Sequence, residues 1–221
     1  YGVGLGPGDP DLITVKSSRL ISQARVIAYP SLAGGESFAR SIAADLISPD
    51  AEEIVMDVPM TVERAPAQAA YDIGAKNIAA VLDRGEDVVC LCEGDPFFYG
   101  SFMYLYARLV ADYQVEVVPG VTSITTCAAR AGMPLAARNE RLTVLPGPLP
   151  AEELRARIEG AESVAIMKVG RHLSKIRAVI ADLGLTDKAA YIERASLPDE
   201  LVCPLAQAPE TAPYFSMIIL T

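Results

Sequence analysis

The sequence lacks several features that mark particular classes of protein. Among its 221 residues, no uncharged apolar run approaches the roughly 20 residues that a membrane-spanning helix needs. The N-terminus shows no basic region followed by an apolar stretch, so no signal peptide is expected. The sequence starts and stops inside what read as strands, and we expect a few residues to be missing at each end. An apolar content of 51% favours a well-packed globular protein over a disordered one.

Cysteine and histidine are scarce, which leaves little material for a metal site. Cys90 and Cys92 share an apolar, strand-like run, whereas Cys127 and Cys203 stand apart. Zinc motifs combine paired cysteines with further Cys or His, and these are missing. We therefore predict reduced, buried thiols, no metal, and a cytoplasmic protein.

Basic residues are outnumbered, with 19 Lys and Arg against 28 Asp and Glu and a net charge of −9. This balance argues against nucleic acids and anionic membranes as partners, because both are negatively charged. It would also repel an anionic small molecule unless cations gather locally. One window, 168–177, contains four cations and no Asp or Glu: Lys168, Arg171, Lys175 and Arg177.

Short β-rich apolar runs alternate with amphipathic segments, which is typical of α/β architecture. The predicted strands lie near 2–5, 26–29, 53–56, 88–92, 115–118, 142–145, 164–169, 189–193 and 215–220. The predicted helices cover 67–84, 101–113, 122–130, 151–158 and 173–183. Because the pattern restarts after Pro119-Gly120, we predict two α/β domains, residues 1–120 and 121–221. The Pro-rich stretches 145–150 and 204–213 are interpreted as surface loops.

Three predicted strand-to-helix loops carry the candidate ligand-binding residues. The first, 2–10, has glycine at every second position, so its backbone could approach a ligand closely. It fits neither the dinucleotide fingerprint G-x-G-x-x-G nor a phosphate-binding P-loop. The second loop, 93–100, reads E-G-D-P-F-F-Y-G, and the third, 119–123, reads P-G-V-T-S. Ligands of open α/β sheets bind at the carboxyl ends of strands, but each loop alone is equally well explained as a turn or a helix cap.

The order and spacing of the three loops are specific to one family of proteins, although no loop is specific alone. In order, the chain contains G-x-G-x-G-P-G-D…L-T, V-x-x-Y-P at 26–30, E-G-D-P-x-x-Y-G and P-G-V-T-S. This series, spread over the whole chain with fitting spacing, resembles the tetrapyrrole methylase family. The resemblance implies two α/β lobes of the class III methyltransferase fold, a cofactor cleft between the lobes, and a homodimer. It also implies that S-adenosylmethionine is the cofactor and that a tetrapyrrole is the substrate.

Carried over motif by motif, the resemblance implies the residues that contact the cofactor. These are Pro7, Gly94, Asp95, Phe98, Thr122, Ser123, Met167 and Ala195. No catalytic base is assigned, because packing or capping explains Glu93 and Tyr99 at least as well.

The substrate of such a family carries many carboxylates, so its binding region must be locally basic. Arginine pairs with carboxylates through two parallel hydrogen bonds. We expect Arg171 and His172 to contact the substrate, with Arg138 and Asn139 as further candidates. Lys175 and Arg177 are interpreted as part of a solvated helix face.

Two alternatives stay open at this point. Within the same class, the enzyme would use a cobalt-containing macrocycle or methylate another macrocycle carbon. From a different class, the chain would be a non-catalytic ligand-binding or nucleotide-binding α/β protein.

Overall fold

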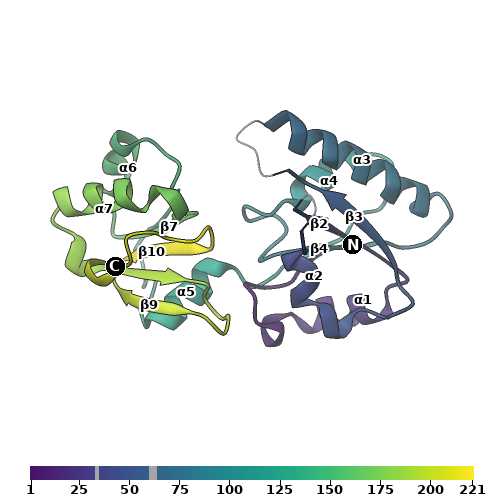
Figure 1. The fold of residues 1–221 in the computed structure, drawn as a ribbon, viewed down its shortest axis with the longest axis horizontal. Helices are drawn as coiled ribbons and strands as arrows, with labels where there is room; N and C mark the ends of the chain where they lie inside the picture. The colour runs from purple at the N-terminus through teal and green to yellow at the C-terminus, as the bar shows by residue number, and fades with distance from the viewer. Residues whose placement is uncertain (33–34, 60–63) are drawn as a thin grey trace. The chain divides into compact units, whose positions relative to one another are not determined.

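The computed structural model describes residues 1–32, 35–59 and 64–221, which form two compact units (Figure 1). Unit 1 comprises Tyr1–Thr122 and unit 2 comprises Ser123–Thr221. This division falls two residues beyond the one expected from the sequence. Within the described ranges, no helix combines the length and the apolar character needed to cross a membrane.

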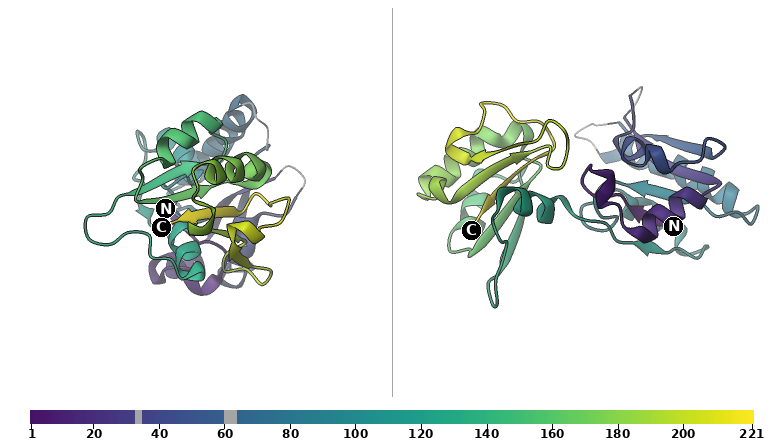
Figure 2. Two further views of the ribbon diagram at one scale, coloured as in Figure 1. Left: turned by 90° about the vertical axis from the view of Figure 1, so that its left-hand side faces the viewer. Right: turned by 90° about the horizontal axis from the view of Figure 1, so that it is seen from below.

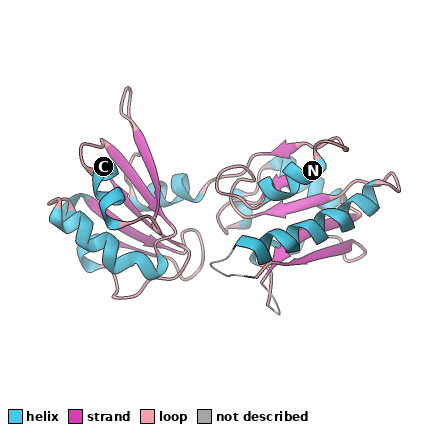
Figure 3. Ribbon diagram, turned by 90° about the horizontal axis from the view of Figure 1, so that it is seen from above, coloured by secondary structure: helices cyan, strands magenta, loops and turns pink. Residues whose placement is uncertain are grey.

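Unit 1 is built on a parallel sheet with helices on both faces (Figures 1 and 3). Its strands are β1 (Gly2–Gly4), β2 (Val26–Ser31), β3 (Glu52–Asp57), β4 (Val89–Cys92) and β5 (Val117–Val118), in the order β3-β2-β4-β1-β5. Its helices are α1 (Val15–Gln23), α2 (Phe38–Ile42), α3 (Arg64–Leu82) and α4 (Phe102–Leu109). Side chains of α1 and α2 form one buried cluster with the sheet, and those of α3 and α4 form another.

The helices that follow β1 and β4 cover opposite faces of the sheet, although these two strands are neighbours. Ile21 of α1 packs with Val3 of β1 in one cluster, whereas Leu105 of α4 packs with Cys90 of β4 in the other. The chain therefore leaves two adjacent strands in opposite directions. In open α/β sheets, this reversal is the place where ligands bind.

Unit 2 has a mixed sheet. Its strands are β6 (Leu142–Pro146), β7 (Ser163–Met167), β8 (Ala189–Glu193), β9 (Leu201–Pro204) and β10 (Ser216–Leu220), in the order β6-β7-β10-β8-β9. Helices α6 (Ala151–Ile158) and α7 (Leu173–Asp182) pack on one face, and α5 (Ser123–Ala131) packs on the other (Figures 1 and 2). Because β10 is antiparallel to β7 and β8, its amino end lies at the same edge as their carboxyl ends.

The predicted strands are present with shifted ends, but α1, α2 and β9 were not predicted. The interpretation of the two Pro-rich stretches as surface loops is wrong in part. Leu145 and Pro146 belong to β6, and Leu145 is buried. The stretch 204–213 contains a short 3-10 turn, in which Leu205 is only 1% exposed and joins the core of unit 2. Proline marks the remainder of these segments correctly as irregular, but it does not tell which side chains face inward.

All four cysteines are free thiols, and three of them are buried. Burial raises the pKa of Cys90 to about 11, so this thiol is un-ionised at neutral pH.

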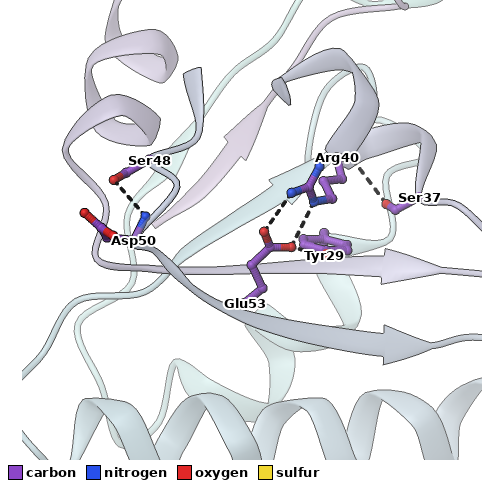
Figure 4. A network of polar contacts seen from close by, with 6 residues as sticks. All are labelled: Tyr29, Ser37, Arg40, Ser48, Asp50 and Glu53. Atoms are coloured by element: carbon purple, nitrogen blue, oxygen red, sulfur yellow. Dashed lines mark hydrogen bonds and ion pairs between the residues drawn. The ribbon is translucent and has the colours of Figure 1, made fainter. Parts of the chain in front are cut away.

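A polar network ties α2 to two strands of unit 1 (Figure 4). Arg40 of α2 donates to the Glu53 carboxylate from Nε and Nη2, at 2.9 and 2.8 Å. The Tyr29 hydroxyl of β2 donates to the same carboxylate. Ser37 caps the helix by accepting from the Arg40 N–H at 3.2 Å. These hydrogen bonds, chiefly those from Arg40, lower the pKa of Glu53 from 4.5 to about 2.

We expect Glu53→Gln to reduce the free energy of unfolding at pH 7 by about 1 kcal/mol, the upper end for solvent-exposed ion pairs. A carboxyl with a lowered pKa stabilises the fold above its ordinary pKa of 4.5, and this contribution disappears as the pH falls towards 2. Urea unfolding of both proteins should therefore show a difference at pH 7 that shrinks at about pH 3.

The matched control is Glu86→Gln, which removes an exposed pair with Arg84 and should change stability less. A difference for Glu53→Gln that stays constant between the two pH values would contradict the ion-pair explanation.

Candidate functional site

Three loops of unit 1 meet through their backbones at the carboxyl ends of β1, β4 and β5. Gly6 and Gly94 form an isolated bridge, with N–H to O distances of 3.2 Å from Gly6 and 2.8 Å from Gly94. A Cβ atom on Gly120 would lie 2.0 Å from the Gly94 oxygen, and one on Gly4 would lie 2.5 Å from the Gly120 Cα. Neither position has room for a side chain. Part of the glycine pattern therefore serves contact between the loops themselves.

Hydrogen bonds of the Asp95 side chain connect the second loop to the third. Its Oδ1 accepts hydrogen bonds from the backbone N–H groups of Phe97 and Phe98, at 2.9 and 3.0 Å. Its Oδ2 accepts from the Gly120 N–H at 3.0 Å. An ionised carboxylate offers about four acceptor sites, so these three bonds leave little capacity for a ligand. The geometry gives Asp95 a positioning role, in addition to any contact with the cofactor.

Gly94 and the aromatic residues of the second loop are open to solvent. Gly94 has φ +64°, and a Cβ atom built on it would meet nothing within 4 Å. Phe98 is exposed, and its ring packs edge-on against Tyr99 with centroids 5.2 Å apart. Tyr99 has φ +57°, which is uncommon for a residue other than glycine. The loop thus presents free space and three exposed rings, those of Phe97, Phe98 and Tyr99, directly after β4.

The remaining unit 1 candidates, Pro7 and Thr122, lie within two residues of the contact between Gly6, Gly94 and Gly120. Both are half-buried. Helix α5 begins at Ser123, so Thr122 immediately precedes the first helical residue. The structure therefore brings Pro7, Gly94, Asp95 and Thr122 to the same end of the unit 1 sheet.

In unit 2, Met167 and Ala195 lie at one edge of the sheet, on either side of β10. Met167 ends β7 and Ala195 follows β8 by two residues, and both belong to the same buried cluster. Ala195 lies between two residues with positive φ, Arg194 at +48° and Ser196 at +70°. The Ser196 N–H donates to Glu200 Oε2 at 2.6 Å, which holds this tight turn in place.

The basic pair Arg171 and His172 follows β7 at the same edge, in a 3-10 turn that spans Gly170–His172. Arg171 is exposed and makes no ion pair with any residue in the described ranges. The pKa of His172 is lowered by burial first and then by the positive charges of Lys175 and Arg171. The imidazole therefore lies in a positive local field.

The solvated-face interpretation of Lys175 and Arg177 is wrong. Lys175 Nζ donates to the carbonyl oxygen of Gly147 at 2.8 Å and to that of Leu149. Arg177 Nη1 donates to the carbonyl oxygen of Ala208 at 3.3 Å. Both cations bind loop backbones of unit 2, and these bonds to neutral groups leave their positive charge uncompensated.

The structure does not bring Arg138 and Asn139 together with Arg171 and His172. Both residues are exposed and precede β6, in the loop that projects from unit 2 (Figure 2). Because β6 and β7 are parallel, this loop lies at the amino ends of the strands. Five residues of extended chain span about 16 Å, so the two pairs lie at opposite ends of the sheet.

Glu93 is a half-buried carboxyl of the second loop. The Ala39 backbone N–H of α2 donates to it, and burial raises its pKa. This contact supports the structural explanation of Glu93 and gives it no catalytic role.

Unit 1 is thus a parallel α/β unit with glycine loops at its strand reversal, and unit 2 is a mixed α/β unit with cations after β7. The family model of the Tetrapyrrole (Corrin/Porphyrin) Methylases matches residues 1–209. The chain belongs to this family, so the family and the fold predicted from the sequence are confirmed.

Two relatives and one solved structure match most of the chain. The chain is 41% identical, over 99% of its length and 93% of the relative, to a precorrin-2 C(20)-methyltransferase of Sinorhizobium sp. It is 32% identical, over 90% of its length and 85% of the relative, to a cobalt-precorrin-2 C(20)-methyltransferase of Salmonella typhimurium. Among solved structures, a uroporphyrin-III C-methyl transferase of Thermus thermophilus, complexed with S-adenyl homocysteine, superimposes with a TM-score of 0.71 at 25% identity. That match covers 99% of this chain and 95% of the other.

We expect Asp95→Asn to loosen either the second or the third loop while unit 1 stays folded. The amide keeps one oxygen acceptor but cannot accept on both sides, so either Gly120 or the Phe97–Phe98 pair loses its bond. Loss of a hydrogen bond to a charged group costs about 1.5–3 kcal/mol. Amide hydrogen exchange should therefore accelerate either at Gly120 or at Phe97 and Phe98, but not at all three.

Asp95→Ala should accelerate exchange at all three amides and destabilise the protein further. Asp50→Asn is the control, because Asp50 is exposed and its hydrogen bond to the Ser48 Oγ is made by its backbone N–H rather than by its carboxylate. Unchanged exchange at these amides in Asp95→Ala would show that the carboxylate does not hold the loops.

Proposed function

We propose that this protein is an S-adenosylmethionine-dependent C-methyltransferase that methylates C20 of precorrin-2 to give precorrin-3A in cobalamin (vitamin B12) biosynthesis. The observation that carries this proposal is 41% identity to a precorrin-2 C(20)-methyltransferase over 99% of the chain. Identity to the relative that uses the cobalt-containing substrate is lower, at 32%. The metal-free substrate is therefore the first choice, and cobalt-precorrin-2 is the alternative.

The loops of unit 1 fit a cofactor that is held largely by backbone atoms. Gly94 has open space in front of it, so a bound molecule can approach the carboxyl end of β4 without a steric clash. The cofactor contacts are assigned to Pro7, Gly94, Asp95, Phe98 and Thr122 in unit 1, and to Ser123, Met167 and Ala195 in unit 2. S-adenosylmethionine supplies an electrophilic methyl group on a positively charged sulfur. The solved relative that is complexed with S-adenyl homocysteine supports this choice of cofactor.

The chemistry asks for positioning more than for acid or base groups. Bound S-adenosylmethionine would give its methyl group to an electron-rich macrocycle carbon and leave as S-adenosylhomocysteine, with one proton lost from the macrocycle to solvent. Holding reactants in attack geometry removes about 7–11 kcal/mol from a barrier at best. The residues of this chain supply that orientation through rigid loops, which Asp95 and the glycine contacts hold in place. No residue is assigned as a catalytic base.

The substrate carries several carboxylates, and the basic edge of unit 2 supplies their partners. Arg171 is exposed and has the planar fork that binds a carboxylate through two bonds. His172 lies beside it in a positive field, so a carboxylate would favour its protonated form. Arg138 and Asn139, at the other end of the sheet, are assigned only to an outlying group of the substrate. Free, mostly buried thiols support a reducing, cytoplasmic location, and we assign a homodimer by resemblance to the family.

The direct test is to incubate the protein with precorrin-2 and S-adenosylmethionine labelled with ¹³C in the methyl group. Mass spectrometry should show one added methyl group, and NMR should place the labelled carbon on C20. A label on another carbon would overturn the regiochemistry, and turnover of cobalt-precorrin-2 alone would favour the alternative substrate. Calorimetry with S-adenosylhomocysteine, NAD and ATP distinguishes a methyltransferase from a non-catalytic nucleotide-binding protein. Binding of NAD or ATP without turnover of any macrocycle would favour the non-catalytic alternative.

Arg171→Ala should raise the KM for precorrin-2 by about 10- to 100-fold, because a charged hydrogen bond contributes about 1.5–3 kcal/mol. The affinity for S-adenosylhomocysteine should not change. Arg171→Lys should recover activity only in part, since lysine keeps the charge but loses the fork. Wild-type activity should also fall with added salt, because at 0.1 M ionic strength the attraction between exposed charges decays over about 10 Å.

The control is Arg19→Ala, which removes an equal charge from the exposed side of α1 in unit 1. An unchanged KM for Arg171→Ala at low ionic strength would exclude Arg171 from the substrate site. Arg138→Ala would then be the next variant to measure.

A further inference from the structure

Two large aromatic rings lie in solvent at the edge of unit 2 that carries Met167 and Ala195. Tyr214 and Phe215 directly precede β10, whose amino end pairs with the carboxyl ends of β7 and β8. They are 50% and 44% exposed, and their rings pack edge-on with centroids 5.4 Å apart. The rings therefore add apolar area to an edge that already holds two assigned cofactor contacts.

The backbone under these rings is firmly held. The Ser216 Oγ accepts from the Gly170 N–H at 3.1 Å, and the Ser216 N–H donates to the backbone carbonyl oxygen of Tyr214 at 2.9 Å. The Arg194 N–H donates to the Phe215 oxygen at 2.9 Å. These bonds fix the segment to the end of β8 and to the 3-10 turn, so the backbone that carries the rings needs no ordering when a ligand binds.

The surroundings of the rings are basic. Lys168 follows Met167, and Gly170 connects the segment to Arg171 and His172. In β8 and the loop after it, Glu193 and Asp199 pair with Arg194, and Glu200 pairs with Arg130. Glu210, four residues before Tyr214, is exposed. The edge thus combines exposed rings with the exposed cation Arg171, which matches a ligand that has both apolar ring faces and negative charge.

We propose that Tyr214 and Phe215 bind a face of the tetrapyrrole substrate while Arg171 and His172 bind its carboxylates. This inference rests on the proposed function and deepens it by naming two specificity-determining residues. Aromatic rings bind conjugated pyrrole rings in offset or edge-on arrangements and need no hydrogen-bond partner on the macrocycle. The rings thereby select for flatness and the cations select for charge.

Kinetics of Tyr214→Ala, Phe215→Ala and the double variant test this assignment. Each single change should raise the KM for precorrin-2 about three- to tenfold, the range expected for one aromatic contact. The KM for S-adenosylmethionine and the unfolding midpoint should stay unchanged. Tyr214→Phe should retain wild-type KM, because it keeps the ring. Tyr104→Ala is the matched control, since Tyr104 is 40% exposed on α4 of unit 1.

A second measurement does not depend on turnover. His172 is the only histidine in the sequence, so its imidazole resonances in untagged protein need no further assignment. Uroporphyrin III, a stable aromatic polycarboxylate, should shift these resonances through its ring current. The double variant should weaken this binding about tenfold or more, whereas Tyr104→Ala should not.

The outcomes separate the two proposals. If the wild type does not methylate precorrin-2, the proposed function fails, while the uroporphyrin titration still reports on the ring pair. If the wild type is active and both ring variants keep wild-type KM and uroporphyrin affinity, the ring assignment is overturned. A shift in oligomeric state on sedimentation of the double variant, with KM unchanged, would also overturn it and assign the rings to contact with a second copy of the chain.

Discussion

The contact of three backbone segments at the carboxyl ends of β1, β4 and β5 constrains everything else in unit 1. A Cβ atom on Gly120 would lie 2.0 Å from the Gly94 oxygen, so the loops approach one another as closely as bare backbone allows. Asp95 adds a charged acceptor that bridges the second and third loops. The strand reversal at β1 and β4 puts these loops where a ligand is expected. Backbone groups and small residues therefore dominate this end of the sheet, which suits methyl transfer, where geometry matters more than proton transfer.

An acidic protein can bind an anionic substrate if its cations are distributed unevenly. In unit 2, arginines such as Arg141 and Arg155 are neutralised by acidic partners. Lys175 and Arg177 instead bind neutral carbonyl groups, and Arg171 is exposed beside them. The charges of Lys175 and Arg171 both act on His172, so positive charge gathers at the turn that follows β7, although the whole chain carries −9. Burial lowers the pKa of His172 first, and the positive charges of Lys175 and Arg171 lower it further.

Sequence patterns predicted the buried elements well and the half-exposed ones poorly. Strands such as β4 and β7 are buried throughout, so they read as continuous apolar runs. Strand β9 has exposed ends and no buried residue, and α2 has only five residues, so neither gives a clear period. The loop motifs located one end of the unit 1 sheet correctly. They could not tell that Asp95 binds backbone groups, because its partner Gly120 is 25 residues away.

The same limit explains why the sequence did not predict Tyr214 and Phe215 as site residues. They stand before their strand, and a rule that looks for ligands after parallel strands passes over them. In the parallel sheet of unit 1, only residues that follow a strand reach the carboxyl edge. In unit 2, β10 runs against β7 and β8, so residues that precede β10 reach the same edge as residues that follow the other two strands. A mixed sheet thus gathers side chains from both chain directions at one place. For a flat substrate with charges around its rim, this arrangement allows aromatic contacts and cations to come from different strands and still act side by side.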